Sequence, residues 1–276
     1  MPTVVTGDGT GLRCEDRGEG RPVVFLNNAM MSSAMWDFQV PVLVDRGYRC
    51  VTYDRRGCGR SGRPGGGYDY DTLADDLAAL VERLDLREVT LVGGAMGAGE
   101  AVRYLTRHGD ARVRQLVLVS PVTPFLMRTQ DNPDGVDLDF FEGDIARMKA
   151  DRAGWLASLT GPFFGGAGAT PDRLFIPPEV ARGLVELALT CSPQAAVELY
   201  RTMAITDLRA DTEKVTVPTL IIHGAADLAA PLDLCGRRTA QLIAGSRLVI
   251  YDSAAHGLFA THPGRLNEDL LSFLAS

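Results

Sequence analysis

Two residues near the end of the chain, Asp227 and His256, each follow an apolar segment and lie in a loop of small residues. A carboxylate that orients a histidine, and a histidine that takes a proton from a nucleophile, form the acid–base part of a triad for acyl transfer. The nucleophile belongs earlier in the chain, at the centre of a Gly-x-x-x-Gly turn between a strand and a helix. Such a turn runs from Gly93 to Gly97, but its central residue is Ala95.

The turn around Ala95 lies where a short apolar run passes into an amphipathic segment. Residues 89–92 predict a buried strand, and a helix carrying Val102, Tyr104 and Leu105 is expected to follow. Glycines two positions before and after the centre remove Cβ atoms that would clash in so tight a reversal. We therefore predict a nucleophile elbow in which Ala95 occupies the nucleophile position.

An acyl-transfer site also needs two backbone N–H groups to hold the developing oxyanion. The first is expected from the residue after the nucleophile position, Met96. The second is expected from the loop after residues 22–26, where Ala29 is the best candidate. The sequence thus predicts an oxyanion hole formed by Ala29 and Met96.

The elements that must position these residues alternate along the chain. Apolar runs predict buried strands at 22–26, 49–53, 89–92, 114–120, 219–223 and 247–251. Amphipathic segments predict helices at 33–45, 71–84, 232–243 and 263–274, and residues 3–15 predict a hairpin. Thr72 and Asp75 are expected to cap the second helix. This alternation predicts an α/β fold with a mostly parallel, doubly wound sheet and sites at the carboxyl ends of its strands.

The pattern changes between the fourth and fifth of these strands, where no further strand is predicted. Two amphipathic helices are expected at 138–159 and 179–191, with a glycine-rich connection at 161–168 between them, and a third helix after Pro193. We interpret residues 122–214 as a helical lid inserted before the last two strands, over a core made of 1–121 and 215–276.

An apolar pocket is expected beneath this lid. The lid supplies six bulky side chains of which about half are expected to face the pocket: Phe125, Met127, Phe140, Phe141, Trp155 and Phe163. The candidate substrate-pocket residues are Asn28, Phe125, Trp155 and Leu258.

The acyl-transfer residues predict a small-molecule substrate, and composition argues against two other kinds of partner. The net charge of −7 argues against nucleic acid and anionic membranes. No apolar run reaches about 18 residues, and five dispersed cysteines favour a reducing compartment, so we expect a cytoplasmic protein. The Gly-x-Gly-x-x-Gly match at 57–62 continues into a loop, and the histidines lack metal-ligand spacing, so neither cofactor nor metal is predicted.

The chain resembles the α/β-hydrolase superfamily and, within it, the cofactor-free haloperoxidases, which include perhydrolases and arylesterases. The resemblance covers nearly the whole chain and is carried by the segments at 52–61, 68–77, 93–100, 132–136, 163–165 and 256–259. It implies a serine hydrolase of small esters and lactones, with the triad at Ala95, Asp227 and His256. Many members also make peracids from a carboxylate and hydrogen peroxide, and many form homo-oligomers, which leaves the oligomeric state open.

The chain departs from this family at three places. The His-Gly of the family's oxyanion loop is replaced by Asn27 and Asn28, and residues 25–37 instead resemble 3-oxoadipate enol-lactonases, which implies a lactone or enol ester. Ala225 replaces the first aspartate of the acid turn. The third departure is Ala95 itself.

Three hypotheses explain an alanine at the nucleophile position, because alanine cannot attack a carbonyl. The first is a deliberate, engineered Ser→Ala change that inactivates a serine hydrolase in order to trap a substrate or product complex, and the retained Asp227 and His256 favour it. The second is a non-hydrolytic lyase, cyclase or cofactor-free oxygenase that uses these two residues as a general base. The third is a ligand-binding receptor, which needs neither residue and is therefore disfavoured.

Overall fold

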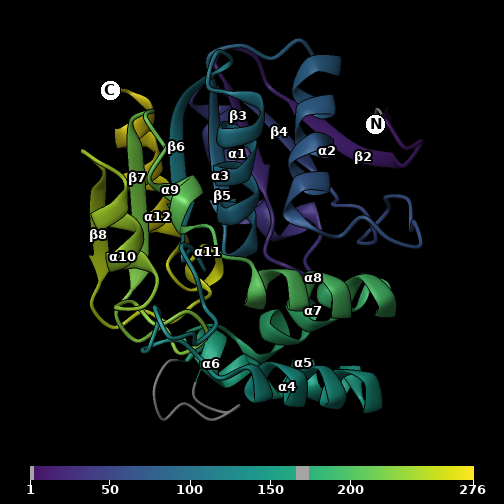
Figure 1. The fold of residues 1–276 in the computed structure, drawn as a ribbon. Coiled ribbons are helices and arrows are strands. Elements are labelled where there is room, and N and C mark those ends of the chain that lie inside the picture. Colours follow the sequence, from purple (N-terminus) through teal and green to yellow (C-terminus); the bar gives the residue numbers. More distant parts are fainter. Residues whose placement is uncertain (1–2, 166–173) are drawn as a thin grey trace.

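The computed structural model describes residues 3–165 and 174–276, and its described strands form one eight-stranded sheet (Figure 1). The strand order is β1-β2-β4-β3-β5-β6-β7-β8. All pairings from β4 to β8 are parallel, whereas β1 and β2 are antiparallel additions at one edge. The prediction of a mostly parallel α/β fold is confirmed.

The strands are β1 (Thr3–Val5), β2 (Gly11–Arg17), β3 (Pro22–Leu26), β4 (Arg49–Tyr53), β5 (Val89–Gly94), β6 (Val113–Val119), β7 (Thr219–Gly224) and β8 (Arg247–Tyr251). Helices outside the inserted region are the 3₁₀ helix η1 (Ser33–Phe38), α1 (Val40–Asp45), α2 (Tyr70–Arg83), α3 (Met96–His108), α10 (Gly236–Leu242), α11 (Leu258–Thr261) and α12 (Pro263–Leu274). Within the inserted region lie α4 (Leu138–Ala150), α5 (Arg152–Ser158), α6 (Thr160–Phe164), α7 (Pro178–Leu189), α8 (Pro193–Ile205) and α9 (Arg209–Thr212).

The central strands are apolar because both faces of the sheet are covered. Every residue of β3 and β5 is buried. Helices α2 and α3 pack together over one face, while α1 and α12 pack together as a second pair. Such two-sided burial is typical of parallel sheets and leaves their carboxyl ends as the open edge for a site.

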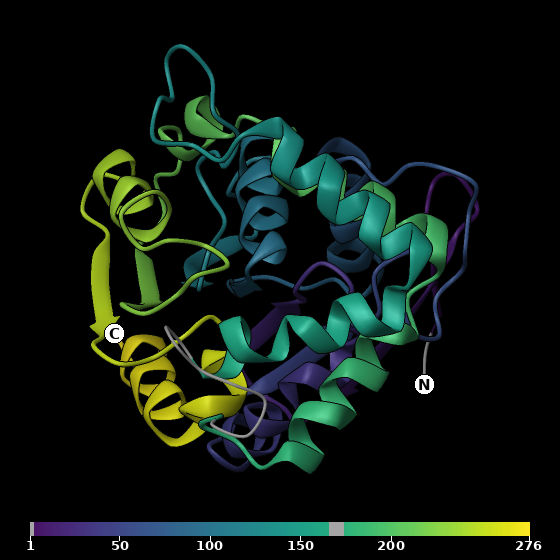
Figure 2. The ribbon, with the colours of Figure 1, turned by 90° about the horizontal axis from the view of Figure 1, so that it is seen from below.

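The lid helices lie across that end of the sheet (Figures 1 and 2). Helix α4 packs on α5 and α8, and α5 packs on α7, so the lid has its own apolar contacts. Helix α9, by contrast, packs against α3 and α10 of the core. The lid boundaries at 122 and 214 stay a prediction, and we use "lid" below for α4 to α8.

Several helix ends differ from the prediction for local reasons. Helix α2 is capped by Asp69, whose carboxylate accepts from the N–H of Thr72, and not by the predicted pair Thr72 and Asp75. The helix predicted at 138–159 is two helices, because Asp151 leaves helical geometry and caps α5 by accepting from the N–H of Gly154.

Three further differences concern predicted segment lengths. The helix predicted at 33–45 is the 3₁₀ helix η1 followed by the separate helix α1. The glycine-rich segment 161–168 begins as helix α6, which ends at Phe164, and residues 166–168 lie outside the described residues. The helix predicted at 232–243 forms only over α10, because the preceding backbone makes turns back to Pro231.

Candidate active site

Ala95 sits on a strained turn between β5 and α3. Its backbone φ is +44°, a left-handed value that L-residues avoid unless the surrounding fold enforces it. The N–H of Ala95 donates to the carbonyl of Val119 on β6 at 3.0 Å, which ties the turn to the next strand. A Cβ at Gly93 or Gly97 would lie 2.6 Å from the backbone oxygen of Gly97 or Leu26, respectively. The geometry is that of a nucleophile elbow.

Asp227 and His256 are brought together at the carboxyl ends of β7 and β8. The Nδ1 atom of His256 lies 2.8 Å from Oδ2 of Asp227, and both side chains are buried. The other carboxylate oxygen accepts from the N–H groups of Ala229 and Ala230 at 2.9 and 2.8 Å. The other nitrogen of the His256 ring has no hydrogen-bond partner among the described residues, which leaves it available to a reactant.

The environment of Asp227 keeps its carboxylate charged. Burial acts to raise the pKa of Asp227, but the positive charge of protonated His256 and hydrogen bonds from His223 and His256 outweigh it. The net result is a pKa well below the ordinary value of an aspartate. A charged carboxylate on Nδ1 fixes the ring orientation and stabilises the imidazolium that forms when His256 takes a proton.

Two residues outside the predicted triad support this pair. His223, at the end of β7, is fully buried, and its Nε2 lies 2.7 Å from the carbonyl of Ala230 and 3.2 Å from Oδ2 of Asp227. Ser120, which also has a positive φ, donates its hydroxyl to the carbonyl of His256 at 2.8 Å. The position of Ser120 directly after a central strand is the only sequence signal for its role.

A buried arginine holds the loop that follows β3. The guanidinium of Arg55 donates to the carbonyls of Asn27, Asn28 and Ala29 at 2.8, 3.1 and 3.1 Å. Its Nε and one Nη atom also donate to Glu100 of α3 at 2.9 and 2.7 Å, and both side chains are almost completely buried. The ion pair therefore fixes the loop after β3, which carries the proposed oxyanion donor Ala29, to the helix that begins at the elbow.

The two amides proposed for the oxyanion hole belong to these two elements, that of Ala29 to the loop after β3 and that of Met96 to α3. Met96 is the first residue of α3, so its N–H has no acceptor within the helix. The N–H of Asn28 donates to the sulfur of Met35 at 3.3 Å, while that of Ala29 donates to no described residue. Of the two neighbouring amides, Ala29 is thus the one available to a ligand.

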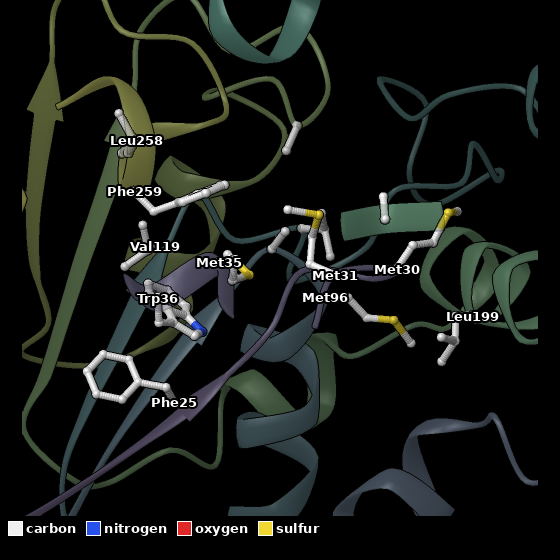
Figure 3. Close-up of a cluster of buried hydrophobic side chains, with 14 of the residues drawn as sticks. Phe25, Met30, Met31, Met35, Trp36, Met96, Val119, Leu199, Leu258 and Phe259 are labelled. Atoms are coloured by element: carbon white, nitrogen blue, oxygen red, sulfur yellow. The ribbon is translucent and has the colours of Figure 1, made fainter. Parts of the chain in front are cut away.

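Large apolar side chains pack under the elbow and its neighbouring loops (Figure 3). The ring centroid of Trp36 lies 5.2 Å from the ring centroid of Phe25 and 6.3 Å from that of Phe259. The indole N–H of Trp36 donates to the side chain of Asn27, which in turn donates to the carbonyl of Tyr53. Asn27 therefore links the oxyanion loop to β4 and to this cluster.

A cavity of about 420 Å³ lies between the candidate site and the lid. Ala95, Ala29, Asn28 and His256 line it on the core side. Its lid side is mostly apolar and includes Phe140, Phe141, Trp155, Leu156, Leu159, Phe163, Leu184, Val185, Ala188 and Met203. The volume and lining suit a small, largely apolar molecule.

Two of the four candidate pocket residues lie outside this cavity. Asn28 and Trp155 line it, but Phe125 and Leu258 do not. Phe125 is buried against the guanidinium of Arg209, which lies 5.2 Å from the ring, and Leu258 is packed into the core at the start of α11. Met127 also lies outside, whereas the remaining predicted lid aromatics line the cavity.

A family model described as the alpha/beta hydrolase fold matches residues 21–263. The chain belongs to the alpha/beta hydrolase fold family. It is 38% identical to a non-heme haloperoxidase from Rhodococcus erythropolis and 32% identical to a bifunctional esterase/perhydrolase from Acinetobacter calcoaceticus, each over the full length of both chains. The crystal structure of a bromoperoxidase from Bacillus anthracis superposes with a TM-score of 0.94 at 36% identity, again over both whole chains.

These relatives confirm the predicted resemblance to the cofactor-free haloperoxidase and perhydrolase group. The roles of Ala95, Asp227, His256, Ala29 and Met96 in this α/β hydrolase stay proposals. Among the described residues, no group of three or more His, Cys, Asp or Glu side chains could hold a metal ion. No described helix of this α/β hydrolase has the length and apolarity needed to cross a bilayer.

Proposed function

We propose that this α/β hydrolase is an ester and lactone hydrolase whose acyl-transfer chemistry requires serine at position 95, and that Ala95 makes the present chain inactive. The observation that carries the proposal is the buried pair of His256 and Asp227, at 2.8 Å, beside an elbow that keeps its left-handed φ. A strained turn and a buried polar pair both cost stability, so their presence together favours a catalytic over a purely structural role.

Restoring a hydroxyl at position 95 completes the proposed reaction. The free nitrogen of His256 accepts the hydroxyl proton while the oxygen attacks the ester carbonyl, and the N–H groups of Met96 and Ala29 stabilise the oxyanion. His256 then protonates the leaving alcohol, and a water deprotonated by His256 hydrolyses the acyl-enzyme. With a lactone, the ring C–O bond breaks in the acylation step, and the hydroxyl group that forms stays tethered to the acyl group through the carbon chain, so the final product is a hydroxy acid.

The test is an Ala95→Ser variant assayed with small aryl esters and lactones. We expect the variant to exceed the Ala95 chain by about 10⁶-fold in kcat, the usual loss when a triad serine is removed. A burst of leaving group equal to the enzyme concentration would report the acyl-enzyme. A correctly folded Ala95→Ser protein with no burst and no turnover on any ester or lactone would contradict the proposal.

The double variants Ala95→Ser with His256→Ala and Ala95→Ser with Asp227→Asn are the matched controls. Each keeps the restored hydroxyl but lacks one partner of the proposed triad. We expect both to lose most of the restored activity, because the three residues act as a unit. A restored activity that does not depend on His256 would assign the chemistry to another residue.

A second candidate is a non-hydrolytic reaction in which His256 and Asp227 act as a general base in the chain as it stands. It is favoured by Asn28, whose polar side chain lines the cavity where the family's oxyanion loop has another residue. This candidate predicts a turnover by the Ala95 chain that His256→Ala abolishes. Proton exchange from a bound carbonyl compound, followed by NMR in deuterated water, would detect it.

A further inference from the structure

Two cysteines from distant parts of the chain meet where the lid joins the core. Cys58 lies in the loop after β4, and Cys191 lies in the corner between α7 and α8. Their sulfur atoms are 2.7 Å apart, and both side chains are buried. The proposed hydrolase reaction uses neither residue.

The backbone around the pair is already fixed in a close approach. The N–H of Ser192 donates to the carbonyl of Gly57 at 2.7 Å, so the residues next to the two cysteines are hydrogen-bonded to each other. Gly57 has a φ of +79°, and a Cβ there would lie 2.3 Å from the Cβ of Ala195, at the start of α8. On the lid side, Arg152 donates to the carbonyl of Cys191 at 2.6 Å.

The two sulfur atoms lie close to bonding distance. Sulfur atoms in a disulfide are about 2.05 Å apart, so the two thiols need to approach by about 0.7 Å. A bond would also close a segment that spans 133 positions of the chain. Closing so long a segment restricts the unfolded chain strongly and thereby stabilises the folded state.

The pair also borders the proposed oxyanion loop. The sulfur of Cys58 lies 3.9 Å from the carbonyl of Ala29, whose N–H is a proposed oxyanion donor. On the other side, α7 carries Leu184, Val185 and Ala188 into the cavity lining and ends just before Cys191. A link between the cysteines would therefore fix one wall of the cavity to the loop opposite.

We propose that Cys58 and Cys191 form a reversible disulfide that fastens the lid to the core under oxidising conditions. The oxidant is a hydroperoxide such as hydrogen peroxide. One thiolate attacks the peroxide oxygen to give a sulfenic acid and water, and the second thiol displaces the sulfenic hydroxyl as water. Overall, two thiols lose two electrons and two protons, and one hydrogen peroxide becomes two waters.

The reduced form is the resting state of this pair. The hydrogen bond between Cys58 and Cys191 is the larger cause, and burial the smaller cause, of a raised pKa of the Cys58 thiol. The raised pKa lowers the fraction of reactive thiolate. We therefore expect oxidation over minutes to hours at millimolar peroxide, and reversal by dithiothreitol.

The experiment uses the full-length chain, reduced with dithiothreitol and then incubated with or without hydrogen peroxide. Remaining thiols are alkylated under denaturing conditions, and the protein is digested with trypsin. Cleavage after arginine releases residues 57–60 and 183–201, each with a single cysteine. We expect a cross-linked peptide of these two segments only after oxidation, together with a rise in melting temperature of about 5 °C or more.

Single variants supply the controls. Cys58→Ala and Cys191→Ala should abolish both the cross-linked peptide and the rise in melting temperature, whereas Cys50→Ala, at a buried cysteine elsewhere, should keep both. The proposal is overturned if peroxide yields no cross-linked peptide, or if the cross-linked protein melts no higher than the reduced one. Oxidation of Cys58 and Cys191 to separate sulfinic acids would overturn it as well. The readouts are independent of catalysis, so they hold whatever the outcome at position 95.

Discussion

At the scale of single residues, the candidate site combines an unreactive side chain with a fully formed acid–base pair. Ala95 lines the cavity without a functional group, while Asp227 accepts hydrogen bonds from His223, His256 and two backbone amides. The contacts hold the carboxylate in its charged form. Folding therefore changes the pKa of Asp227, and this change can be measured as a dependence of stability on pH.

The lowered pKa of Asp227 predicts a loss of stability in acid. Below about pH 5, the unfolded chain begins to protonate this aspartate, whose ordinary pKa is 3.8, while the folded chain does not. The free energy of unfolding therefore falls with decreasing pH, by up to about 1.4 kcal/mol per pH unit for this group. Asp227→Asn should remove that share of the slope when urea denaturation is followed between pH 6 and pH 3. An unchanged slope in the variant would contradict the lowered pKa.

At the scale of elements, the elbow depends on how closely α3 approaches β3. Gly97 lies in the first turn of α3, and a Cβ at that position would meet the carbonyl oxygen of Leu26 at 2.6 Å. The obstacle is the backbone of a buried central strand, which cannot move aside. The same helix carries Glu100, whose ion pair with Arg55 holds the loop after β3, so any shift of α3 displaces both sides of the candidate site.

The close approach predicts opposite effects for two helical glycines. Gly97→Ala should lower the free energy of unfolding by about 1–3 kcal/mol, because the added methyl overfills a packed contact. Gly143→Ala in α4 should raise it by about 0.5–1 kcal/mol, because its Cβ would meet nothing within 4 Å and alanine is the better helix former. Urea denaturation of both variants measures the two effects. A Gly97→Ala protein as stable as the parent would show that α3 is free to move.

At the scale of the whole molecule, the cavity exists only because the lid packs across the carboxyl end of the sheet (Figure 2). The lid contacts the candidate site directly. The ring centroid of Phe163 lies 4.6 Å from that of His256, and the carbonyl of Phe163 accepts from the N–H of Gly257 at 2.8 Å. A ligand bound in the cavity would therefore contact the core and the lid at once.

A ligand in this cavity should stabilise the Ala95 chain, because this chain is expected not to hydrolyse it. At a ligand concentration about 100-fold above Kd, the free energy of unfolding rises by about 2.7 kcal/mol, which corresponds to a melting temperature about 5 °C higher. An aryl ester such as phenyl acetate is a suitable probe for a thermal shift assay.

Two matched substitutions locate the binding. Ala188→Phe fills the cavity from α7 and should abolish the shift, whereas Ala157→Phe, on the exposed side of α5, should preserve it. Equal shifts in both variants would place the ligand elsewhere.

Local patterns in the sequence were sufficient for most of the architecture. The boundaries of β3, β4, β8 and α12 agree with the prediction to the residue, because apolar runs and helical periodicity mark buried elements directly. The turn at Ala95 and the contact of Asp227 with His256 also lie where the sequence placed them, because each residue follows a predicted strand. Their catalytic roles stay proposals. Helix starts and breaks were harder to predict, as Asp69 and Asp151 show, because several nearby side chains compete to cap the backbone.

Only the tertiary structure decided which side chains face one another. Sequence periodicity marks Phe125 and Trp155 alike as apolar lid residues, yet packing turns one against Arg209 and the other into the cavity. The contact of Cys58 with Cys191 likewise joins segments with no local relation in the sequence. Residue type and spacing determined the fold and the chemistry that could occur, because both follow from local backbone physics. The pocket lining and the thiol pair depend on long-range packing, which short sequence patterns do not encode.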